Sequence, residues 1–293
     1  PQSASFVVRR LSRLGVPTDT LSLTRFNLTR GLRRLAVYLK CFEPDILHSH
    51  LGRSDLLSAV AAFRRCPAVS TFHATRSVHS LPTQIGYLLT DPIVTERSAV
   101  SQAVMRSFYR ALPLRAPCRV INNAVDIARL QGGSAAGADV TALRRLLGVD
   151  GRARLITNVG RFVPVKAQHR LLEAMPEVLR HIPDSRLVLC GTGPLERALR
   201  REAARLSVQS AVLFVAPLGG VGALLRASEL FVTTSMSEGN SLALLEAMAL
   251  GLPIVSTPNR GNLEVLTHGI EGLIVDPREA GALAGAIVGL MTD

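Results

Sequence analysis

The stretch from residue 230 to residue 256 restricts the fold of this chain more than any other. The apolar run Leu230–Thr234 predicts a buried strand, and a small polar loop follows it. Apolar residues then repeat at helical spacing over 242–249, until Gly251 and Pro253 end the helix and begin a second strand. This strand–loop–helix–strand order is typical of a parallel sheet, which binds ligands at the carboxyl ends of its strands.

The same stretch carries residues that suit an anionic ligand. Backbone amides at Asn240, Ser241 and Leu242 begin the predicted helix, where a phosphate can bind. Glu238 precedes these amides, and Glu246 follows two turns into the helix. Two glutamates eight residues apart are also common on ordinary solvated helices, so the spacing alone leaves that alternative open.

The amino-acid sequence of this stretch is more specific than the spacing of its two glutamates. Residues 237–255 read Ser-Glu-Gly-Asn-Ser-Leu-Ala-Leu-Leu-Glu-Ala-Met-Ala-Leu-Gly-Leu-Pro-Ile-Val. This sequence resembles the donor-binding signature of glycosyltransferase family 4, retaining enzymes of the GT-B type. The resemblance implies an α/β fold with two Rossmann-like domains facing across a cleft. It also implies that Glu246 binds the nucleotide ribose, that Glu238 contacts the sugar near its reacting face, and that the Gly239–Ser241 amides assist the leaving diphosphate.

A second motif follows the predicted strand Leu155–Val159. Gly160, Arg161 and Lys166 open the next helix, where two cations could bind a diphosphate or could equally be solvated on a surface turn. The motif is similar to the family's Gly-Arg-Leu-x-x-x-Lys-Gly loop, which implies that both cations bind the donor diphosphate. Here Ala167 and Gln168 replace the usual glycine.

Three other loops resemble family segments. Gly191 and Gly193 form a strand-to-helix turn that any doubly wound domain can contain. The resemblance places this turn near the nucleotide base, together with the loop at Leu218. In the loop that begins at Thr257, Arg260 stands where glycine is commoner, so its backbone angles are in doubt.

Histidines in the first half offer further candidates. His73 ends the predicted strand 68–73, where a structural role is the alternative to a catalytic one. Its Thr-x-His wording resembles the family and implies a catalytic role. His48 and His50 share one strand face, but no third ligand follows at metal-binding spacing, so no metal site is predicted. The chain also lacks Asp-x-Asp, which favours a metal-independent site without a cofactor besides the donor substrate.

The 293 residues suffice for two domains, and 47% of them are hydrophobic. The glycine-rich segment 132–137 predicts a linker, which gives an N-terminal domain over 1–126, a linker with an entry helix over 127–152, and a C-terminal domain over 153–293. Within the first domain, Glu96 and Arg97 fit poorly in a buried strand. The resemblance implies that the first N-terminal strand and the last C-terminal helices of the family are missing.

The charge distribution bears on partners. The net charge is +12, and basic residues are dense before residue 41. This pattern is compatible with nucleic acid, an anionic membrane surface, an anionic acceptor, or basic residues used for solubility. Aromatic residues make up only 4% of the chain and tryptophan is absent, so nucleic acid is disfavoured. Four widely spaced cysteines are typical of reduced thiols, and the expected location is the cytoplasm, including the inner face of the membrane.

The resemblance, taken with these observations, implies a retaining glycosyltransferase. It would move a sugar from a UDP- or GDP-linked donor to a hydroxyl group of a glycan or lipid-linked acceptor, in the synthesis of cell-surface glycans or glycolipids. One alternative is a module that binds nucleotide sugars without turnover. Another is a basic protein that binds membranes or nucleic acid.

Overall fold

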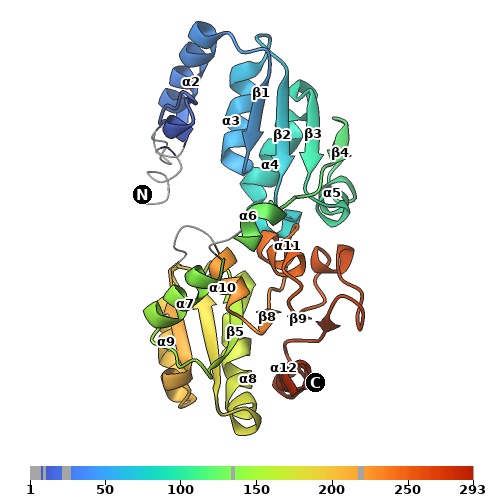
Figure 1. The fold of residues 1–293 in the computed structure, drawn as a ribbon. Helices are drawn as coiled ribbons and strands as arrows, with labels where there is room; N and C mark the ends of the chain where they lie inside the picture. Colours follow the sequence, from blue (N-terminus) through green and yellow to red (C-terminus); the bar gives the residue numbers. More distant parts are fainter. Residues whose placement is uncertain (1–7, 9–10, 22–27, 133–135, 217–220, 293) are drawn as a thin grey trace. The chain divides into compact units, whose positions relative to one another are not determined.

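Two parallel sheets organise the chain. The computed structural model describes residues 8, 11–21, 28–132, 136–216 and 221–292. One sheet has four strands in the order β1-β2-β3-β4, and the other has six in the order β10-β9-β8-β5-β6-β7 (Figure 1). In the second sheet the strand order reverses beside β5, which is the arrangement of a doubly wound domain. The predicted α/β class is therefore confirmed.

The chain divides into two compact units. The first comprises Pro1–Thr71, His79–Ser98 and Pro113–Cys118. The second comprises Phe72–Val78, Ala99–Leu112 and Arg119–Asp293, so the segments that follow β2 and β3 belong to it. The sequence-based domain limits at residues 126 and 152 stay a prediction.

The first sheet and its helices follow the predicted alternation closely. Helix α4 (Leu81–Thr90) and strand β3 (Glu96–Ala99) were not predicted. The sequence Asp19-Thr-Leu-Ser-Leu23 predicts a strand, but no strand forms at residues 19–21, and residues 22 and 23 lie outside the described part of the chain. The elements are α2 (Leu28–Phe42), β1 (Leu47–His50), α3 (Gly52–Ala62), β2 (Ala68–Phe72), η1 (Arg76–Val78), α4 (Leu81–Thr90), η2 (Asp91–Ile93), β3 (Glu96–Ala99), α5 (Gln102–Tyr109) and β4 (Cys118–Val120).

Arg97 is buried within β3 because a carboxylate neutralises its guanidinium. Arg97 Nη2 lies 3.2 Å from Asp91 Oδ1, and Arg97 Nη1 donates to Ser70 Oγ at 3.2 Å. Asp91 Oδ2 also accepts the backbone N–H groups of Arg115 at 2.6 Å and Ala116 at 3.3 Å. A buried charge is tolerated where such partners satisfy it. The expectation that Arg97 fits poorly in a buried strand was therefore wrong.

The second sheet has the elements that the apolar runs predicted, with shifts of a few residues at their ends. Residues 217–220, which include Leu218, lie outside the described part of the chain. The elements are α6 (Ile127–Gln131), α7 (Ala136–Leu146), β5 (Arg154–Val159), η4 (Pro164–Lys166), α8 (Gln168–His181), β6 (Ser185–Cys190), α9 (Glu196–Arg205), η5 (Gln209–Ala211), β7 (Val212–Val215), α10 (Gly222–Arg226), β8 (Leu230–Thr233), α11 (Leu242–Ala249), β9 (Ile254–Ser256), η6 (Asn262–Glu264), β10 (Leu273–Ile274) and α12 (Ala280–Thr292).

Side chains of the second sheet alternate between one large hydrophobic core and two smaller ones. On β5, Ile156 packs in the core with α8, α9 and α12, whereas Leu155 packs with α7 and α10. On β8, Val232 joins the first of these cores and Phe231 packs with α11. Because helices cover both faces, most residues of these strands are buried, including the polar residues Thr157 and Asn158 of β5, and polar loops follow at their carboxyl ends.

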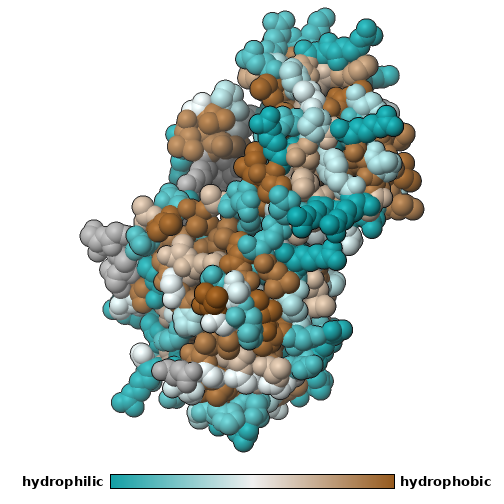
Figure 2. Space-filling view, turned by 90° about the vertical axis from the view of Figure 1, so that its right-hand side faces the viewer, coloured by the Kyte–Doolittle hydropathy of each residue, from teal (hydrophilic) through white to brown (hydrophobic). Residues whose placement is uncertain are grey.

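The surface of the molecule is mixed in character. Hydrophobic and hydrophilic side chains are interspersed over the face that Figure 2 displays. Among the described helices, none is both long enough and apolar enough to cross a membrane. All four cysteines are free thiols, and burial raises the pKa of Cys190 to about 11.

Candidate active site

The loop between β8 and α11 is the centre of the candidate site. Strand β8 is buried along its whole length, and the chain that leaves it reaches the surface at Met236, beyond the carboxyl edge of the sheet. Ser241 caps α11, since its Oγ accepts the backbone N–H of Leu244 at 3.4 Å. The other N–H groups of a first helical turn have no acceptor within the helix, and they favour an anion there.

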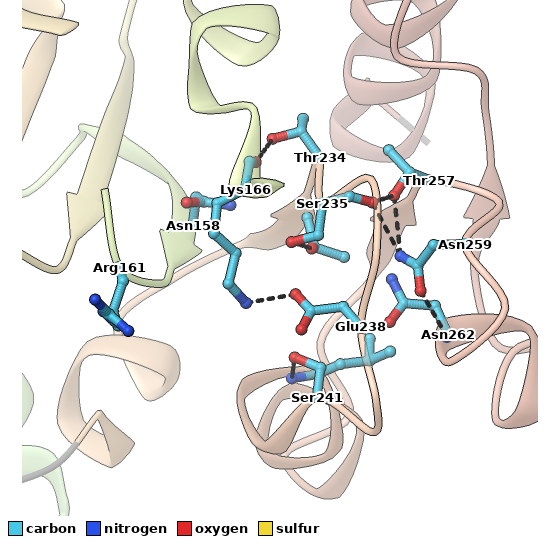
Figure 3. Close-up of polar contacts among 12 residues, drawn as sticks. Asn158, Arg161, Lys166, Thr234, Ser235, Glu238, Ser241, Thr257, Asn259 and Asn262 are labelled. Carbon is cyan, nitrogen blue, oxygen red and sulfur yellow. Dashed lines mark hydrogen bonds and ion pairs between the residues drawn. The ribbon is translucent and has the colours of Figure 1, made fainter. Parts of the chain in front are cut away.

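Polar side chains that follow β9 fix the start of this loop (Figure 3). The carbonyl oxygen of Ser235 accepts hydrogen bonds from Thr257 Oγ1 and from Asn259 Nδ2, the latter at 3.0 Å. Asn259 Oδ1 accepts the backbone N–H of Asn262 at 3.1 Å, and Asn262 Nδ2 donates to Ser256 Oγ at 2.8 Å. Sequence reasoning gave Thr257, Asn259 and Asn262 no role. The available signal was a run of polar residues directly after a buried strand.

The structure brings two predicted catalytic residues together. Lys166 Nζ forms an ion pair with Glu238 Oε1 (Figure 3), and the two side chains are only 22% and 12% exposed. Thr234 Oγ1 donates to the carbonyl oxygen of Lys166 at 2.9 Å, and the Met236 N–H donates to that of Val165 at 2.8 Å. The loops that carry the cation and the carboxylate are therefore hydrogen-bonded to each other.

Arg161 lies apart from this ion pair. Its side chain is exposed, and Figure 3 shows its guanidinium pointing away from Lys166 and Glu238. The backbone is fixed, since the carbonyl oxygen of Arg161 accepts Gln168 Nε2 at 3.0 Å. No described residue forms a hydrogen bond or an ion pair with the guanidinium. Arg161 is therefore available to an anionic ligand, but it does not contact the other predicted catalytic groups.

Ala167 has the backbone conformation that glycine prefers. Its φ is 47° and its ψ is 36°, which is the left-handed region. A Cβ makes this region unfavourable by about 1 to 2 kcal/mol. The glycine commonly found in the resembled motif suits this turn, and the side chain of Ala167 is accommodated at a cost. Arg260, in contrast, is absent from the described residues with positive φ.

Replacing Ala167 with glycine is expected to stabilise the protein by about 0.5 to 1 kcal/mol. The gain is the relief of left-handed strain, less the extra freedom of glycine in the unfolded chain. Chemical denaturation of wild type and variant measures it. Ala174→Gly, within α8, is the control and should destabilise. Equal or lower stability of Ala167→Gly would contradict the strain argument.

Gly191 and Gly193 allow close contact between two loops. A Cβ on Gly191 would lie 1.9 Å from the carbonyl oxygen of Gly160, and one on Gly193 would lie 2.4 Å from that of Phe162. The loops are also hydrogen-bonded, because the N–H of Phe162 donates to the carbonyl oxygen of Thr192 at 3.0 Å. Packing therefore requires both glycines, and their contact with a nucleotide stays a prediction.

Asn240 is a buried polar residue, and Glu246 is a partly buried one. Asn240 is 8% exposed, and neither polar atom of its side chain has a hydrogen-bond partner in the described part of the chain. Such a buried amide is costly, and a ligand could satisfy it. Glu246 is partly buried on α11, and burial raises the pKa of its carboxyl group, an effect that the charge of Arg129 opposes.

His73 and the loop of Gly239 are neighbours within the second unit. A Cβ on Gly239 would lie 2.2 Å from the carbonyl oxygen of His73, so the absence of a side chain permits this approach. The imidazole of His73 is on an exposed residue, and its catalytic role stays a prediction. The role of Leu218 also stays a prediction, because that residue lies outside the described part.

The histidines of β1 have a different setting. His48 Nε2 is 2.7 Å from Thr71 Oγ1, and the ring centres of His48 and His50 are 4.3 Å apart. Within the described residues no three His, Cys, Asp or Glu side chains gather as a metal site. Burial and the neighbouring His50 lower the pKa of His48.

Two family models match the chain. Residues 139–293 match glycosyl transferases group 1, and residues 2–129 match glycosyltransferase family 4. The first match covers more than half of the chain and contains Lys166, Glu238 and the loop network described above.

Named relatives are similar over most of this chain. A D-inositol 3-phosphate glycosyltransferase of Kribbella flavida is 30% identical over 275 residues, which cover 85% of this chain and 63% of that protein. An N-acetyl-alpha-D-glucosaminyl L-malate synthase of Bacillus anthracis is 26% identical over 258 residues, which cover 85% of this chain and 66% of that protein. The chain thus spans about two thirds of the length of these relatives.

Solved structures share the fold. The Anabaena protein Alr3699/HepE in complex with UDP-glucose has a TM-score of 0.86 at 24% identity, over 97% of this chain and 79% of that one. Sucrose-phosphate synthase of Thermosynechococcus elongatus has a TM-score of 0.78 at 19% identity, over 93% and 71%. The predicted GT-B fold is confirmed by these neighbours and by the two parallel sheets.

Proposed function

Because the chain belongs to the glycosyl transferases of group 1, we propose that it transfers a sugar from a nucleoside-diphosphate sugar to a hydroxyl group of an acceptor. The observation that carries this proposal is the ion pair between Lys166 and Glu238. It lies where the loops after β5 and β8 are hydrogen-bonded, next to the start of α11.

The proposed chemistry uses these groups in separate roles. When the bond between sugar and diphosphate breaks, negative charge develops on the diphosphate. Lys166 and the amides that begin α11 would meet that charge, and catalysis is strongest where fixed groups meet charge as it forms. Glu238, released from Lys166, would contact the sugar near its reacting carbon. Glu246 would accept hydrogen bonds from the ribose.

The finer assignments are part of the same proposal. We propose retention of the anomeric configuration, a UDP- or GDP-linked donor, and no requirement for a metal ion. The UDP and UDP-glucose held by the Anabaena neighbour support the nucleotide class. The proposed setting is synthesis of cell-surface glycans or glycolipids in the cytoplasm, with peripheral binding to anionic membranes. Helix α2 supports that setting, because it exposes Arg30, Arg33, Arg34 and Lys40 and contains no acidic residue.

Calorimetric titration with UDP, GDP and ADP is expected to show saturable binding of one nucleotide. Glu246→Ala should weaken that binding by about 10- to 100-fold, because hydrogen bonds to a charged group are lost. Glu279→Ala is the matched control, since Glu279 is an exposed glutamate with no described contact to the site. Binding that Glu246→Ala leaves unchanged would contradict the ribose assignment.

A binding module without turnover is the second candidate. Residues 120–126 read Val-Ile-Asn-Asn-Ala-Val-Asp and resemble the family's Val-Ile-Pro-Asn-Gly-Val-Asp, but Asn122 replaces the proline and Ala124 the glycine, and these departures favour the second candidate. Release of nucleoside diphosphate in the presence of acceptor separates the two. Binding with no release under any acceptor condition would contradict the transferase proposal and support the module.

A further inference from the structure

A cavity of about 410 Å³ opens beside Glu238. It is large enough for a small hydroxylated molecule. The segment after β2, helix α5 and the loops after β8 and β9 contribute its lining, and every lining residue belongs to the second unit. These residues are Thr75, Arg76, Ser77, Ala103, Ser107, Met236, Ser237, Glu238, Pro258, Asn259 and Arg260.

Hydrogen bonds fix the walls of this cavity. Thr75 Oγ1 is 2.9 Å from Ser237 Oγ, which joins the segment after β2 to the loop of Glu238. The backbone N–H of Arg76 donates to Ser107 Oγ at 2.9 Å, and that hydroxyl donates to the carbonyl oxygen of Val104 at 2.7 Å. The main chain that carries Arg76 is thus fixed on α5.

The charges of the lining favour an anion. Arg76 and Arg260 are its two cations, and Glu238 is its one carboxylate. Glu238 is paired with Lys166, and Arg76 also has a partner within the chain, so Arg260 is the cation on which anion binding depends. Arg260 is exposed, and its guanidinium has no hydrogen bond or ion pair with a described residue. It directly follows Asn259, whose amide is fixed on Ser235. A guanidinium presents its donors in a planar fork that matches phosphate and carboxylate groups.

We propose that this cavity binds the sugar acceptor, and that the acceptor is a small hydroxylated molecule carrying a phosphate or carboxylate group that Arg260 and Arg76 bind. This rests on the proposed function. With the anion at the two arginines, an acceptor hydroxyl lies beside Glu238, where the donor sugar is expected. The hydroxyl oxygen bonds to the anomeric carbon, the bond from that carbon to the diphosphate breaks, the nucleoside diphosphate leaves with the electron pair, and the hydroxyl proton passes to water.

The test is equilibrium binding of matched acceptors, followed by turnover with the same compounds. The pairs are glucose 6-phosphate with glucose, inositol 3-phosphate with inositol, and malate with its dimethyl ester. In the binding measurements the protein is saturated with the nucleoside diphosphate that it binds in the titration described above. We expect the anionic member of at least one pair to bind, and Arg260→Gln to weaken that binding by about 10- to 100-fold. Arg201→Gln on α9, an exposed arginine outside the cavity, should leave it unchanged.

The binding measurement tests the inference, and the turnover measurement tests the proposed function on which the inference rests. Equal binding of anionic and neutral members, or anion binding that Arg260→Gln does not weaken, would overturn the inference. Anion binding that depends on Arg260, with no transfer of sugar to any compound, would uphold the anion site and contradict the proposed function. The phosphate and carboxylate pairs show which of the two groups the arginines prefer.

Discussion

Replacing Lys166 with alanine is expected to lower kcat for sugar transfer by about 10²- to 10³-fold, which is the usual loss when one fixed group that meets transition-state charge is removed. Lys166 is the cation that the structure places against Glu238. Its loss leaves the largely buried Glu238 carboxylate without its cation, so some folding stability should be lost, but less than the loss in turnover. Release of nucleoside diphosphate measures the rate, and thermal denaturation measures the stability.

The matched variant for this experiment is Lys40→Ala, because Lys40 is an exposed lysine on α2. It should leave kcat unchanged with a soluble acceptor. Lys166→Arg adds a second comparison, because a planar guanidinium does not reproduce the compact charge of an ammonium group. Full turnover by Lys166→Ala would show that Lys166 does not meet the developing charge.

Replacing Arg97 with methionine is expected to destabilise the first unit by about 3 to 5 kcal/mol. Asp91 would remain buried without the guanidinium, and an uncompensated buried charge is the costly part of a broken ion pair. The backbone N–H groups of Arg115 and Ala116 would still bond to Asp91 and would offset part of the loss.

Urea denaturation, combined with hydrogen exchange at β2 and β3, measures this change within the first unit. Arg53→Met is the control, because Arg53 is an exposed arginine on α3. A loss for Arg97→Met no larger than the loss for Arg53→Met would show that the pair with Asp91 contributes little.

The sequence predicted the second sheet better than the first, for a physical reason. Strands such as β6 and β8 are covered on both faces, so they contain short apolar runs that stand out between polar loops. Strand β3 contains Glu96 and Arg97, and its burial depends on Asp91, which a linear pattern does not connect to it. Helix α4 has Pro82 in its first turn and mixed polarity, which conceals its period.

For the candidate site, the amino-acid sequence of the motifs identified candidate residues, but it did not indicate which of their side chains are in contact. Lys166 and Glu238 were both predicted from motifs, but 72 residues separate them, and only the adjacency of β5 and β8 brings them together. The same adjacency, between β8 and β9, places Thr257 and Asn259 on Ser235. The left-handed turn at Ala167 was concealed because a glycine position was filled by another residue.

The chain contains 34 lysine and arginine residues, but only Lys40 and Lys166 are lysines. An amine-directed reagent therefore has two side-chain targets, and the one in the site is paired with a carboxylate. The rate of modification at the Lys166 amine would change whenever a diphosphate or a substrate displaces Glu238 from that amine. The natural sequence thus provides a chemical label that reports occupancy of the site without any introduced residue.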